Sequence, residues 1–391
     1  FGGGSTFKIF PTAAALEAGV IGFDSRLPDP YHDCFPPPAT NRYTRCYPVS
    51  NDGAGYPDPI SLQQALATSP NVPFVGLETK VGLPAVVQMA QRLGLRHTLA
   101  ANELGAAPVT DPADPRSRDP RYAQPQSQYF SGLLSFTLGV SPVSPLEMAN
   151  VVATLESGGV WCPPDPVLSV TDRFGAPVPL TGQLPCQQVV ASGLADTLRA
   201  GLSQDTRFGT SAAAARAAGW QHADLGKTGT TEQSESAVFV GGVDGYAAAS
   251  MVFADGAHPA ELCPGPPVHV GSCGNGAFGG TVAAPSYFTA LSTLLAGRPD
   301  RPVPPPDPAY LLPDPHGPTV PYAVGMSAAA ARNALGGAGY PVREHPLPGA
   351  GPARRVVAQS PQGSVPAGTP VQLWLAGAGP LSASSAAGAR P

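Results

Sequence analysis

The chain has 391 residues, of which 46 are Gly and 49 are Pro, and only 13% are charged. Because 42% of the residues are apolar, the chain can bury a core, and the excess of Gly and Pro indicates loop-rich globular domains with linkers rather than wholesale disorder or collagen. The net charge of −5 and the lack of a basic run argue against a nucleic-acid partner. No apolar stretch is long enough to cross a bilayer, since the best candidate, Ala237 to Ala254, is interrupted by glycines and Asp244.

The first chemical signal is Ser5-Thr6-Phe7-Lys8, at the start of a predicted helix. Positions i and i+3 of a helix share a face, so the Ser5 hydroxyl and the Lys8 amine can touch. A lysine with a lowered pKa can take the proton from a serine and make it a nucleophile. An ordinary surface pair is the alternative. Pro11 is expected to kink or break this helix.

The six cysteines fall into three pairs that are close in sequence: Cys34 with Cys46, Cys162 with Cys186, and Cys263 with Cys273. Their spacing and loop settings favour disulfides over a zinc site, which predicts an oxidising compartment. Six unrelated buried thiols are the alternative. The seven histidines are scattered, so we expect no metal site and no cofactor.

A second motif, Ser69-Pro70-Asn71, precedes an apolar stretch from Val75 to Leu93. We expect this stretch to be helical in two pieces, because Pro84 interrupts it. Taken alone, the motif is more often a helix N-cap than a catalytic group. Lys80 is expected to be a solvated helix residue, and the segment Ala107 to Gln128, rich in Asp, Pro and Arg, a surface excursion.

A group of strands is predicted near the end of the larger part of the chain. The three strands cover Leu225–Thr231, Ala237–Gly242 and Tyr246–Asp255, and the short turns between them make them antiparallel. A helix is expected to follow from Ala284 to Leu295, with Pro285 in its first turn.

The third motif, Lys227-Thr228-Gly229, lies on the first of these strands and is followed by Thr230 and Thr231. An edge strand can pair with an extended peptide, and Gly229 leaves room for the close approach of another backbone. Lys227 and Thr228 are suited to hold a carboxylate.

The last part of the chain has its own signals. Nine prolines from Arg298 to Pro318 predict a semi-rigid polyproline spacer. After it, Ser327 is a good N-cap for a helix over Ala328–Leu335. Alternating side chains predict two strands, over Arg354–Gln359 and Val371–Leu375, and the Ala- and Ser-rich tail after Gly379 is expected to be disordered.

Taken in order, these three motifs resemble those of the penicillin-binding and serine β-lactamase superfamily. The segments around them resemble the transpeptidase domain of class A penicillin-binding proteins, namely Gly4 to Lys8 with Ala13 to Gly19, Ser144 to Ala149, and Phe278 to Pro285. The pair Thr230-Thr231 favours class A over class B. The residues after Pro318 resemble a PASTA domain, through Val320-Pro321, Val324 to Ser327, Leu335, Gly339-Tyr340, Gln359 to Pro361 and Val365 to Thr369.

The resemblance implies an α+β fold in both domains. It implies a transpeptidase domain, an antiparallel sheet with helices, over residues 1–297, a Pro-rich linker over 298–317, a PASTA domain over 318–378 and a disordered tail over 379–391. Because the family places two strands and a helix before its serine, we expect an incomplete domain with an unpaired edge at Tyr246–Asp255. The family's membrane anchor and glycosyltransferase domain are expected to be absent from this chain. The preference for Arg over Lys and the single PASTA domain suggest an actinobacterial type.

The resemblance also implies acyl transfer on peptidoglycan. Ser5 attacks the carbonyl between two D-alanines of a stem peptide, and an amine of a neighbouring stem resolves the acyl-enzyme. Lys8 is the base for Ser5, Ser69 relays a proton to the departing D-alanine, and Asn71 holds Lys8 and the substrate amide.

The implied substrate-binding residues are those of the third motif. Lys227, Thr228 and Thr230 bind the terminal carboxylate beside Gly229, and the backbone N–H groups of Ser5 and Thr230 form the oxyanion hole. β-Lactams are the expected inhibitors, and the extracytoplasmic face of the plasma membrane or the cell wall is the expected location.

One departure from the family pattern and two alternative functions stay open. Ile9 stands where the family has a proline, which bears on how Ser5 and Lys8 are seated. A serine β-lactamase or DD-carboxypeptidase of the same superfamily is the enzymatic alternative, and for a β-lactamase Glu147 is the candidate to activate water; we expect it instead to be a helix-surface residue. A non-catalytic peptidoglycan-binding protein is the alternative from another class.

Overall fold

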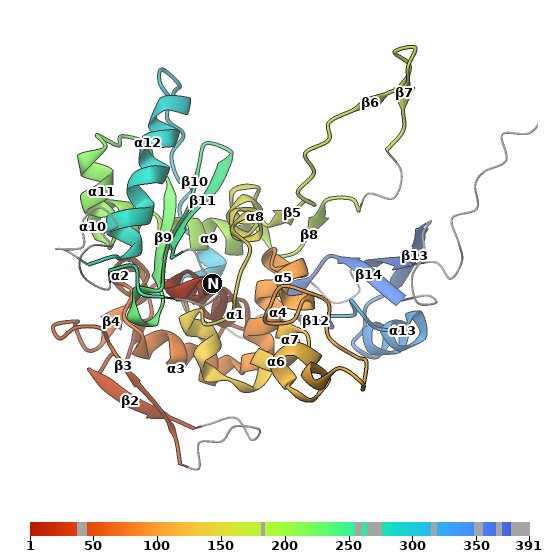
Figure 1. Ribbon diagram of the computed structural model, residues 1–391, viewed down its shortest axis with the longest axis horizontal. Coiled ribbons are helices and arrows are strands. Elements are labelled where there is room, and N and C mark those ends of the chain that lie inside the picture. The colour runs from red at the N-terminus through yellow and green to blue at the C-terminus, as the bar shows by residue number, and fades with distance from the viewer. Residues whose placement is uncertain are drawn as a thin grey trace, which may run out of the picture. The chain divides into compact units, whose positions relative to one another are not determined.

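The computed structural model describes residues 1–36, 45–180, 184–254, 260–263, 276–313, 319–347, 355–364 and 370–376 (Figure 1). The chain divides into two compact units. The first comprises residues 1–161 and 191–316, and the second comprises residues 162–190 and 317–391. No helix in the described ranges combines the length and the apolar character needed to cross a membrane.

The first unit is mainly helical. Its longer helices are α1 Ile9–Glu17, α2 Leu62–Thr68, α3 Val72–Val81, α4 Leu83–Leu93, α5 Arg96–Ala100, α8 Pro145–Glu156, α9 Ser192–Leu202, α10 Gln204–Phe208, α11 Ala212–Ala217 and α12 Ala284–Leu294. Shorter turns are η1 Gly4–Lys8, η2 Pro115–Arg118, α6 Pro120–Ala123, α7 Gln126–Tyr129, η3 Phe130–Gly132, η4 Leu134–Leu138, η5 Glu232–Ser234, the π-helical η7 Gly279–Ala283 and η8 Pro308–Tyr310. Its strands are β1 Arg26–Leu27, β2 His32–Phe35, β3 Tyr47–Ser50, β4 Ile60–Ser61, β5 Val160–Trp161, β9 Leu225–Thr230, β10 Ser236–Val243 and β11 Tyr246–Phe253.

The three predicted strands form the main sheet of this unit. The order is β11-β10-β9 and both pairs are antiparallel, as expected from the short turns. Lys227 lies opposite Val240 and Gly229 opposite Val238. Among the described strands, β9 and β11 each pair on one side only. Strand β9, which carries Lys227-Thr228-Gly229, is therefore an edge strand, and the expected unpaired edge at β11 is present.

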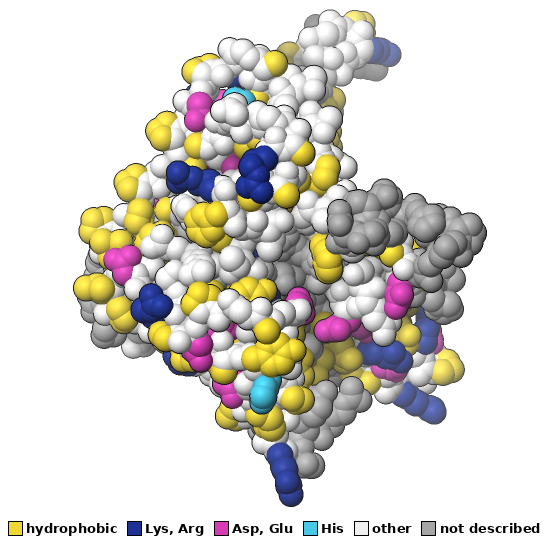
Figure 2. Space-filling model, turned by 90° about the vertical axis from the view of Figure 1, so that its left-hand side faces the viewer, with side chains coloured by type: hydrophobic (Ala, Val, Ile, Leu, Met, Phe, Trp, Pro, Cys, Tyr) yellow, Lys and Arg dark blue, Asp and Glu magenta, His cyan; other side chains and the backbone are white. Residues whose placement is uncertain are grey.

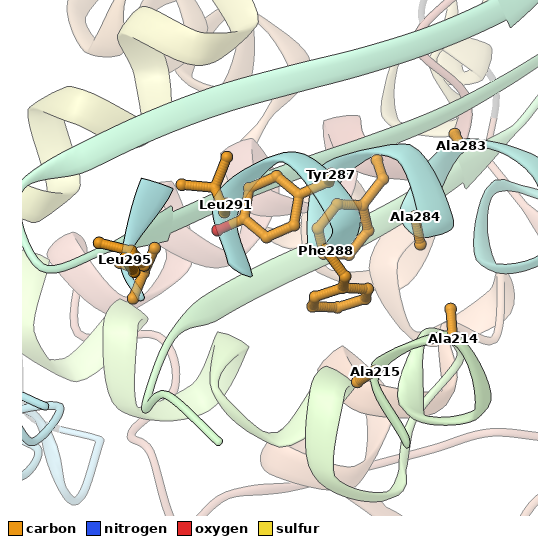
Figure 3. Packing of buried hydrophobic residues seen from close by; sticks show 10 residues of the cluster. Ala214, Ala215, Ala283, Ala284, Tyr287, Phe288, Leu291 and Leu295 are labelled. Carbon is orange, nitrogen blue, oxygen red and sulfur yellow. The ribbon is translucent and has the colours of Figure 1, made fainter. Parts of the chain in front are cut away.

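Helices cover both faces of this sheet. A Cβ added at Gly241 would lie 2.6 Å from the Tyr287 ring of α12, whereas one added at Gly242 would lie 2.7 Å from Val152 of α8. Successive strand residues point to opposite faces, so α12 and α8 pack on opposite sides of β10. Figure 3 shows the α12 side, where Tyr287, Phe288 and Leu291 pack with small side chains of α11.

The expected break at Pro11 does not occur. The chain makes a 3₁₀ turn over η1 and continues as α1 from Ile9, so Pro11 is the third residue of the α-helix. The N–H groups of the first helical residues have no intrahelical partner, so a proline costs no hydrogen bond there. The irregularity lies instead at the junction of Lys8 and Ile9.

Three further expectations concern the helical region. The interruption at Pro84 is confirmed, since α3 ends at Val81 and α4 begins at Leu83, and Lys80 is exposed. The expectation that Glu147 lies on a helix surface is wrong. Its carboxylate is buried and accepts the backbone N–H groups of His97 and Thr98, each at 2.7 Å, at the start of α5. It therefore caps one helix from another.

The Pro-rich segment makes specific contacts with the first unit. The Asp307 N–H donates to Thr197 Oγ1 at 3.0 Å. The carbonyl groups of Tyr310 and Leu311 accept the N–H groups of Phe23 and Asp24, at 2.7 and 3.0 Å. Tyr310 is buried. The part of the expected spacer up to Leu311 is thus docked on the first unit by its own hydrogen bonds.

The second unit contains a small α+β domain. Its helix is α13 Ala328–Gly337, and Ser327 Oγ accepts the Ala330 N–H at 3.2 Å as the expected N-cap. The strands are β6 Val170–Thr171, β7 Pro177–Val178, β8 Gln187–Gln188, β12 Thr319–Val320, β13 Val342–Leu347, β14 Arg355–Ser360, β15 Gly363–Ser364 and β16 Val371–Ala376. The unpredicted β13 pairs in parallel with β16, and the sheet order is β13-β16-β14. The tail after residue 376 lies outside the described residues.

Two of the three expected disulfides are present. Cys34 and Cys46 join the β2–β3 hairpin, and Cys162 and Cys186 close a loop in the second unit. Cys263 is also in a disulfide, whereas Cys273, its expected partner, lies outside the described residues.

Candidate active site

The Ser5 turn lies directly against strand β9 (Figure 1). Gly4 has φ +56°, and a Cβ added there would lie 2.5 Å from the Thr230 backbone nitrogen. A Cβ added at Gly229 would lie 2.2 Å from the Gly3 carbonyl oxygen. Because neither position has room for a side chain, the two backbones meet, and the first and third motifs become neighbours.

The Lys8 amine is fully buried and makes three hydrogen bonds to the second motif. Its Nζ donates to the Ser69 carbonyl oxygen at 2.7 Å, to Ser69 Oγ at 3.2 Å and to Asn71 Oδ1 at 2.8 Å. In the described part of the chain Ser5 Oγ has no hydrogen-bond partner, so the direct Ser5–Lys8 contact expected from helical spacing is replaced by contacts between Lys8 and the second motif. Residues 61 to 63 positions apart in sequence thus share one site.

Burial lowers the pKa of Lys8 well below its usual value of 10.5. The positive charge of Lys227 lowers this pKa further, while Asp52 and Asp29 oppose the effect. All three acceptors of Lys8 are neutral groups, which compensate a buried ammonium only in part. The arrangement therefore favours an amine that can give up its proton and act as a base.

The turn between α2 and α3 positions Ser69 and Asn71. Ser69 ends α2 in the left-handed conformation, with φ 64°, and its N–H donates to the Ala65 carbonyl at 2.8 Å. The alternative that the motif supplies a helix N-cap holds for Asn71, which is the N-cap residue of α3 but makes no side-chain cap hydrogen bond. This tight turn places the side chains of Ser69 and Asn71 within hydrogen-bond distance of Lys8 Nζ.

Asn51 is a site residue that the motifs did not reveal. Its Oδ1 accepts the N–H groups of Asn71 and Val72, at 2.7 and 3.0 Å, and its Nδ2 donates to Asp29 Oδ1 at 2.7 Å. Asn71 Nδ2 donates to the Ser50 carbonyl at 2.9 Å, which leaves Asn71 Oδ1 facing Lys8. Asn51 thus caps α3 from outside and fixes the place of Asn71.

Lys227 is also fully buried but has an acidic neighbour. Burial lowers its pKa to about 8, while the charge of Asp205 raises it. Its Nζ donates to the Thr228 carbonyl at 3.2 Å. Burial raises the pKa of Asp205, whereas the charge of Lys227 lowers it. Asp205 is a second site residue without a recognisable sequence signal, because it stands alone between polar residues.

The two threonines of the third motif have different partners. Thr228 is buried, and its Oγ1 is hydrogen-bonded to Thr210 Oγ1, whose own contact is with Asp205. Thr230 is half-buried, and its Oγ1 accepts the Gly279 N–H at 3.1 Å. All the expected site residues, Ser5, Lys8, Ser69, Asn71, Lys227, Thr228, Gly229 and Thr230, thus lie in the first unit around the contact of η1 with β9.

This arrangement provides what acyl transfer through a serine requires. It contains a serine hydroxyl at the start of a helix, a buried amine with a lowered pKa, and an edge strand whose N–H and C=O groups are open to an extended peptide. Within the described ranges no group of three or more His, Cys, Asp or Glu side chains is placed to hold a metal ion. On the face in Figure 2 the Lys and Arg side chains lie singly or in small groups and form no continuous basic surface over the described residues.

Comparisons with known proteins agree with this geometry. The family model for the penicillin-binding protein transpeptidase domain matches residues 1–251. Penicillin-binding protein 1A of Neisseria meningitidis serogroup A is 26% identical over 302 residues, which are 75% of this chain and 31% of that protein. Peptidoglycan D,D-transpeptidase PbpA of Mycobacterium tuberculosis is 29% identical over 161 residues, 41% of this chain and 30% of that protein. The chain therefore spans about a third of the length of the curated relatives that it matches.

A solved structure shows the same fold. PonA1 of Mycobacterium tuberculosis in complex with penicillin V superposes with a TM-score of 0.57 at 20% identity, and the match covers 81% of this chain and 76% of that one.

Proposed function

Since the chain belongs to the family of penicillin-binding protein transpeptidase domains, we propose that it cross-links peptidoglycan stem peptides by acyl transfer through Ser5. The donor is a stem peptide that ends in two D-alanines, and the acceptor is an amine of a neighbouring stem. β-Lactams act as inhibitors because they acylate the same serine. The names of the similar proteins, a D,D-transpeptidase and a structure with bound penicillin V, support this proposal.

Each residue of the site has a role in this proposal. Lys8 removes the Ser5 proton, and the Ser5 oxygen then attacks the carbonyl carbon of the penultimate D-alanine. The Ser5 and Thr230 N–H groups hold the negative oxygen that develops. Ser69 passes a proton to the departing D-alanine amine, and Asn71 holds Lys8 and the substrate amide.

The remaining residues of the third motif bind the end of the donor peptide. Lys227 attracts its terminal carboxylate, Gly229 keeps β9 close to the Ser5 turn, and the hydroxyls of Thr228 and Thr230 are the candidate hydrogen-bond donors. The backbone of β9 pairs with the peptide as an added strand.

The observation that carries the proposal is the environment of Lys8. A fully buried amine whose three acceptors are neutral holds its proton weakly. A purely peptide-binding site has no need of such a group beside a serine.

Further features of the chain belong to the same proposal. We infer that the second unit contains a PASTA domain over residues 318–378, which helix α13 and the sheet of β13, β16 and β14 support. We also infer a class A, actinobacterial type that acts on the extracytoplasmic face of the membrane or in the cell wall. The disulfides support an oxidising location.

Labelling with a fluorescent penicillin, followed by intact-mass analysis, tests the proposed function. We expect a stable adduct of one penicillin per chain that is lost in Ser5→Ala. Rapid release of hydrolysed drug would instead indicate a β-lactamase. The absence of an adduct in a folded chain would indicate a peptidoglycan-binding protein without acyl transfer.

A further inference from the structure

The inference concerns the hairpin of strands β2 and β3, and it rests on the proposed function. The end of this hairpin reaches the site. Asn71 Nδ2 donates to the Ser50 carbonyl at 2.9 Å, and Asn51 Oδ1 accepts the Asn71 N–H at 2.7 Å. Because Asn71 Oδ1 accepts from Lys8 Nζ at 2.8 Å, the end of the hairpin holds a hydrogen-bond partner of the proposed base.

The hairpin packs on the rest of the first unit through one row of side chains. Val49 is buried, and Phe35 and Tyr47 are partly buried in the same apolar cluster, which includes residues of α3. Cys34 and Pro48, which lie opposite each other in the pairing, are exposed. A two-stranded hairpin is at best marginally stable by itself, so a further restraint is needed to fix its strands.

The disulfide between Cys34 and Cys46 supplies this restraint. Cys34 lies in β2 and Cys46 precedes β3, so the bond joins the two strands near one end of their pairing. From there β3 runs without interruption to Ser50, and Asn51 follows. A cross-link restricts the conformations that the joined strands can reach. It therefore restricts the positions of the Ser50 carbonyl and the Asn51 amide, which hold Asn71.

We propose that the Cys34–Cys46 disulfide is a positioning element of the active site, so that acylation is fast in the oxidised chain and slow once this bond is reduced. Cys34 is exposed, so a small dithiol can reach the bond. In the exchange the S–S bond breaks, two thiols form on the protein, and the dithiol is oxidised to a disulfide. The disulfide Cys162–Cys186 belongs to the second unit, away from the site residues in sequence, and provides a matched comparison.

The first test compares acylation by benzylpenicillin in the parent chain, in Cys34→Ser/Cys46→Ser and in the control Cys162→Ser/Cys186→Ser. The rate is measured per active site, from the amount of adduct formed at completion, so unfolded chains do not count. We expect the first variant to be acylated about ten-fold more slowly than the parent chain and the control at the parent rate. Equal losses in the two variants, or no loss in the first, would overturn the inference.

Reduction of the folded chain tests the bond itself. Dithiothreitol should lower the acylation rate of the parent chain and of Cys162→Ser/Cys186→Ser to that of Cys34→Ser/Cys46→Ser, and oxidised glutathione should restore it. Alkylation and mass analysis confirm that the bond has been reduced. The acylation rate of Cys34→Ser/Cys46→Ser should not respond to dithiothreitol. A response in this variant as large as in the parent chain would assign the effect to another disulfide and contradict the inference.

A double-mutant cycle with Asn51→Ala distinguishes positioning from general destabilisation. If the disulfide acts through the hold of Asn51 on Asn71, the chain that combines Cys34→Ser/Cys46→Ser with Asn51→Ala should lose little more than the larger of the two separate losses in rate. A merely structural role predicts that the two losses multiply, which would contradict the inference.

The parent chain separates the two proposals. Its acylation at Ser5 supports the proposed function whatever the cysteine variants show. A parent chain that forms no Ser5 adduct would overturn the proposed function and this inference with it.

Discussion

Lys8 and Lys227 are both fully buried beside the Ser5 turn, yet their surroundings differ. Lys8 is bound by a carbonyl, a hydroxyl and an amide oxygen, and its pKa is far below the usual value. Lys227 has Asp205 nearby, which opposes the effect of burial and leaves its pKa at about 8. The difference teaches that burial alone does not define the role of a lysine. Neutral partners prepare one amine to lose a proton, and a carboxylate keeps the other charged.

The same substitution at both lysines tests this difference most strongly. In Lys8→Arg the side chain stays charged and cannot serve as a base, so we expect acylation by benzylpenicillin to fall about a thousand-fold. In Lys227→Arg the charge is kept, and we expect a loss of about ten-fold or less. Stopped-flow or gel-based acylation rates measure both.

Lys80→Arg is the matched control, because Lys80 is exposed on α3. Its acylation rate should equal that of the parent chain. Equal losses in the Lys8 and Lys227 variants would show that the two lysines do not differ in role.

The pH profile of acylation sharpens the comparison. Lys227 has its pKa lowered to about 8, so its charge, and with it the attraction for a carboxylate, is lost as the pH rises through that value. We expect the rate constant for benzylpenicillin to decline above pH 8 by about ten-fold per unit at most. In Lys227→Arg the decline should move to higher pH, because arginine stays protonated. An unchanged alkaline decline in this variant would assign it to another group.

A third prediction concerns Asn51, which holds the backbone of Asn71, one of the hydrogen-bond partners of Lys8. We expect Asn51→Ala to lower the acylation rate of folded protein about ten-fold, because Asn71 loses the acceptor that fixes its backbone. Asn102 is the control, since it is equally buried and bonds four backbone groups of a loop outside the site. Asn102→Ala should lower Tm but leave the acylation rate of the folded fraction unchanged. A similar rate in the two variants would exclude a positioning role for Asn51.

The smallest expected effect concerns Glu78, a buried residue of α3 to which we assign no role in acylation or carboxylate binding. Burial raises its pKa well above 4.5, although Thr137 opposes the effect. Between pH 4.5 and this raised pKa the native state binds more protons than the unfolded state, so the free energy of unfolding falls as the pH rises. We expect Glu78→Gln to remove this fall and to gain at least about 1 kcal/mol at pH 8, or roughly 2 °C in Tm.

Thermal unfolding from pH 5 to 8 measures this effect. Glu261→Gln is the control, because Glu261 is exposed. If the parent chain and Glu78→Gln had the same pH dependence, Glu78 would be ionised in the native protein.

The sequence predicts most of this site because its motifs combine residue types that few other arrangements use. The lysines are rare in the chain, and two of the three lie in motifs that the structure brings together. Asn51 and Asp205 escaped prediction because each is a single polar residue whose partners are reached only through the fold. Asn51 lies 20 positions from Asn71, and no local pattern marks such a pairing.

The fold was predictable to a similar degree. Strands β9, β10 and β11 were predicted with the short turns between them, and β14 and β16 from alternating side chains; both signals are local. Strand β13 was missed because it pairs in parallel with β16, whose residues come after another strand, and because its sequence, VREHPL, does not alternate apolar and polar residues. The wrong expectation for Glu147 has the same origin, since its carboxylate caps α5, a helix some 50 positions earlier in the chain.

The docked segment around Tyr310 also determines where the first unit can be shortened. A chain ended at Gly297 would leave the N–H groups of Phe23 and Asp24 without their acceptors and would uncover the surface beneath Tyr310. A chain ended after Pro313 keeps these bonds. A shortened chain for crystallisation or inhibitor screening should therefore keep the prolines between residues 298 and 313, although their composition alone would suggest a removable linker.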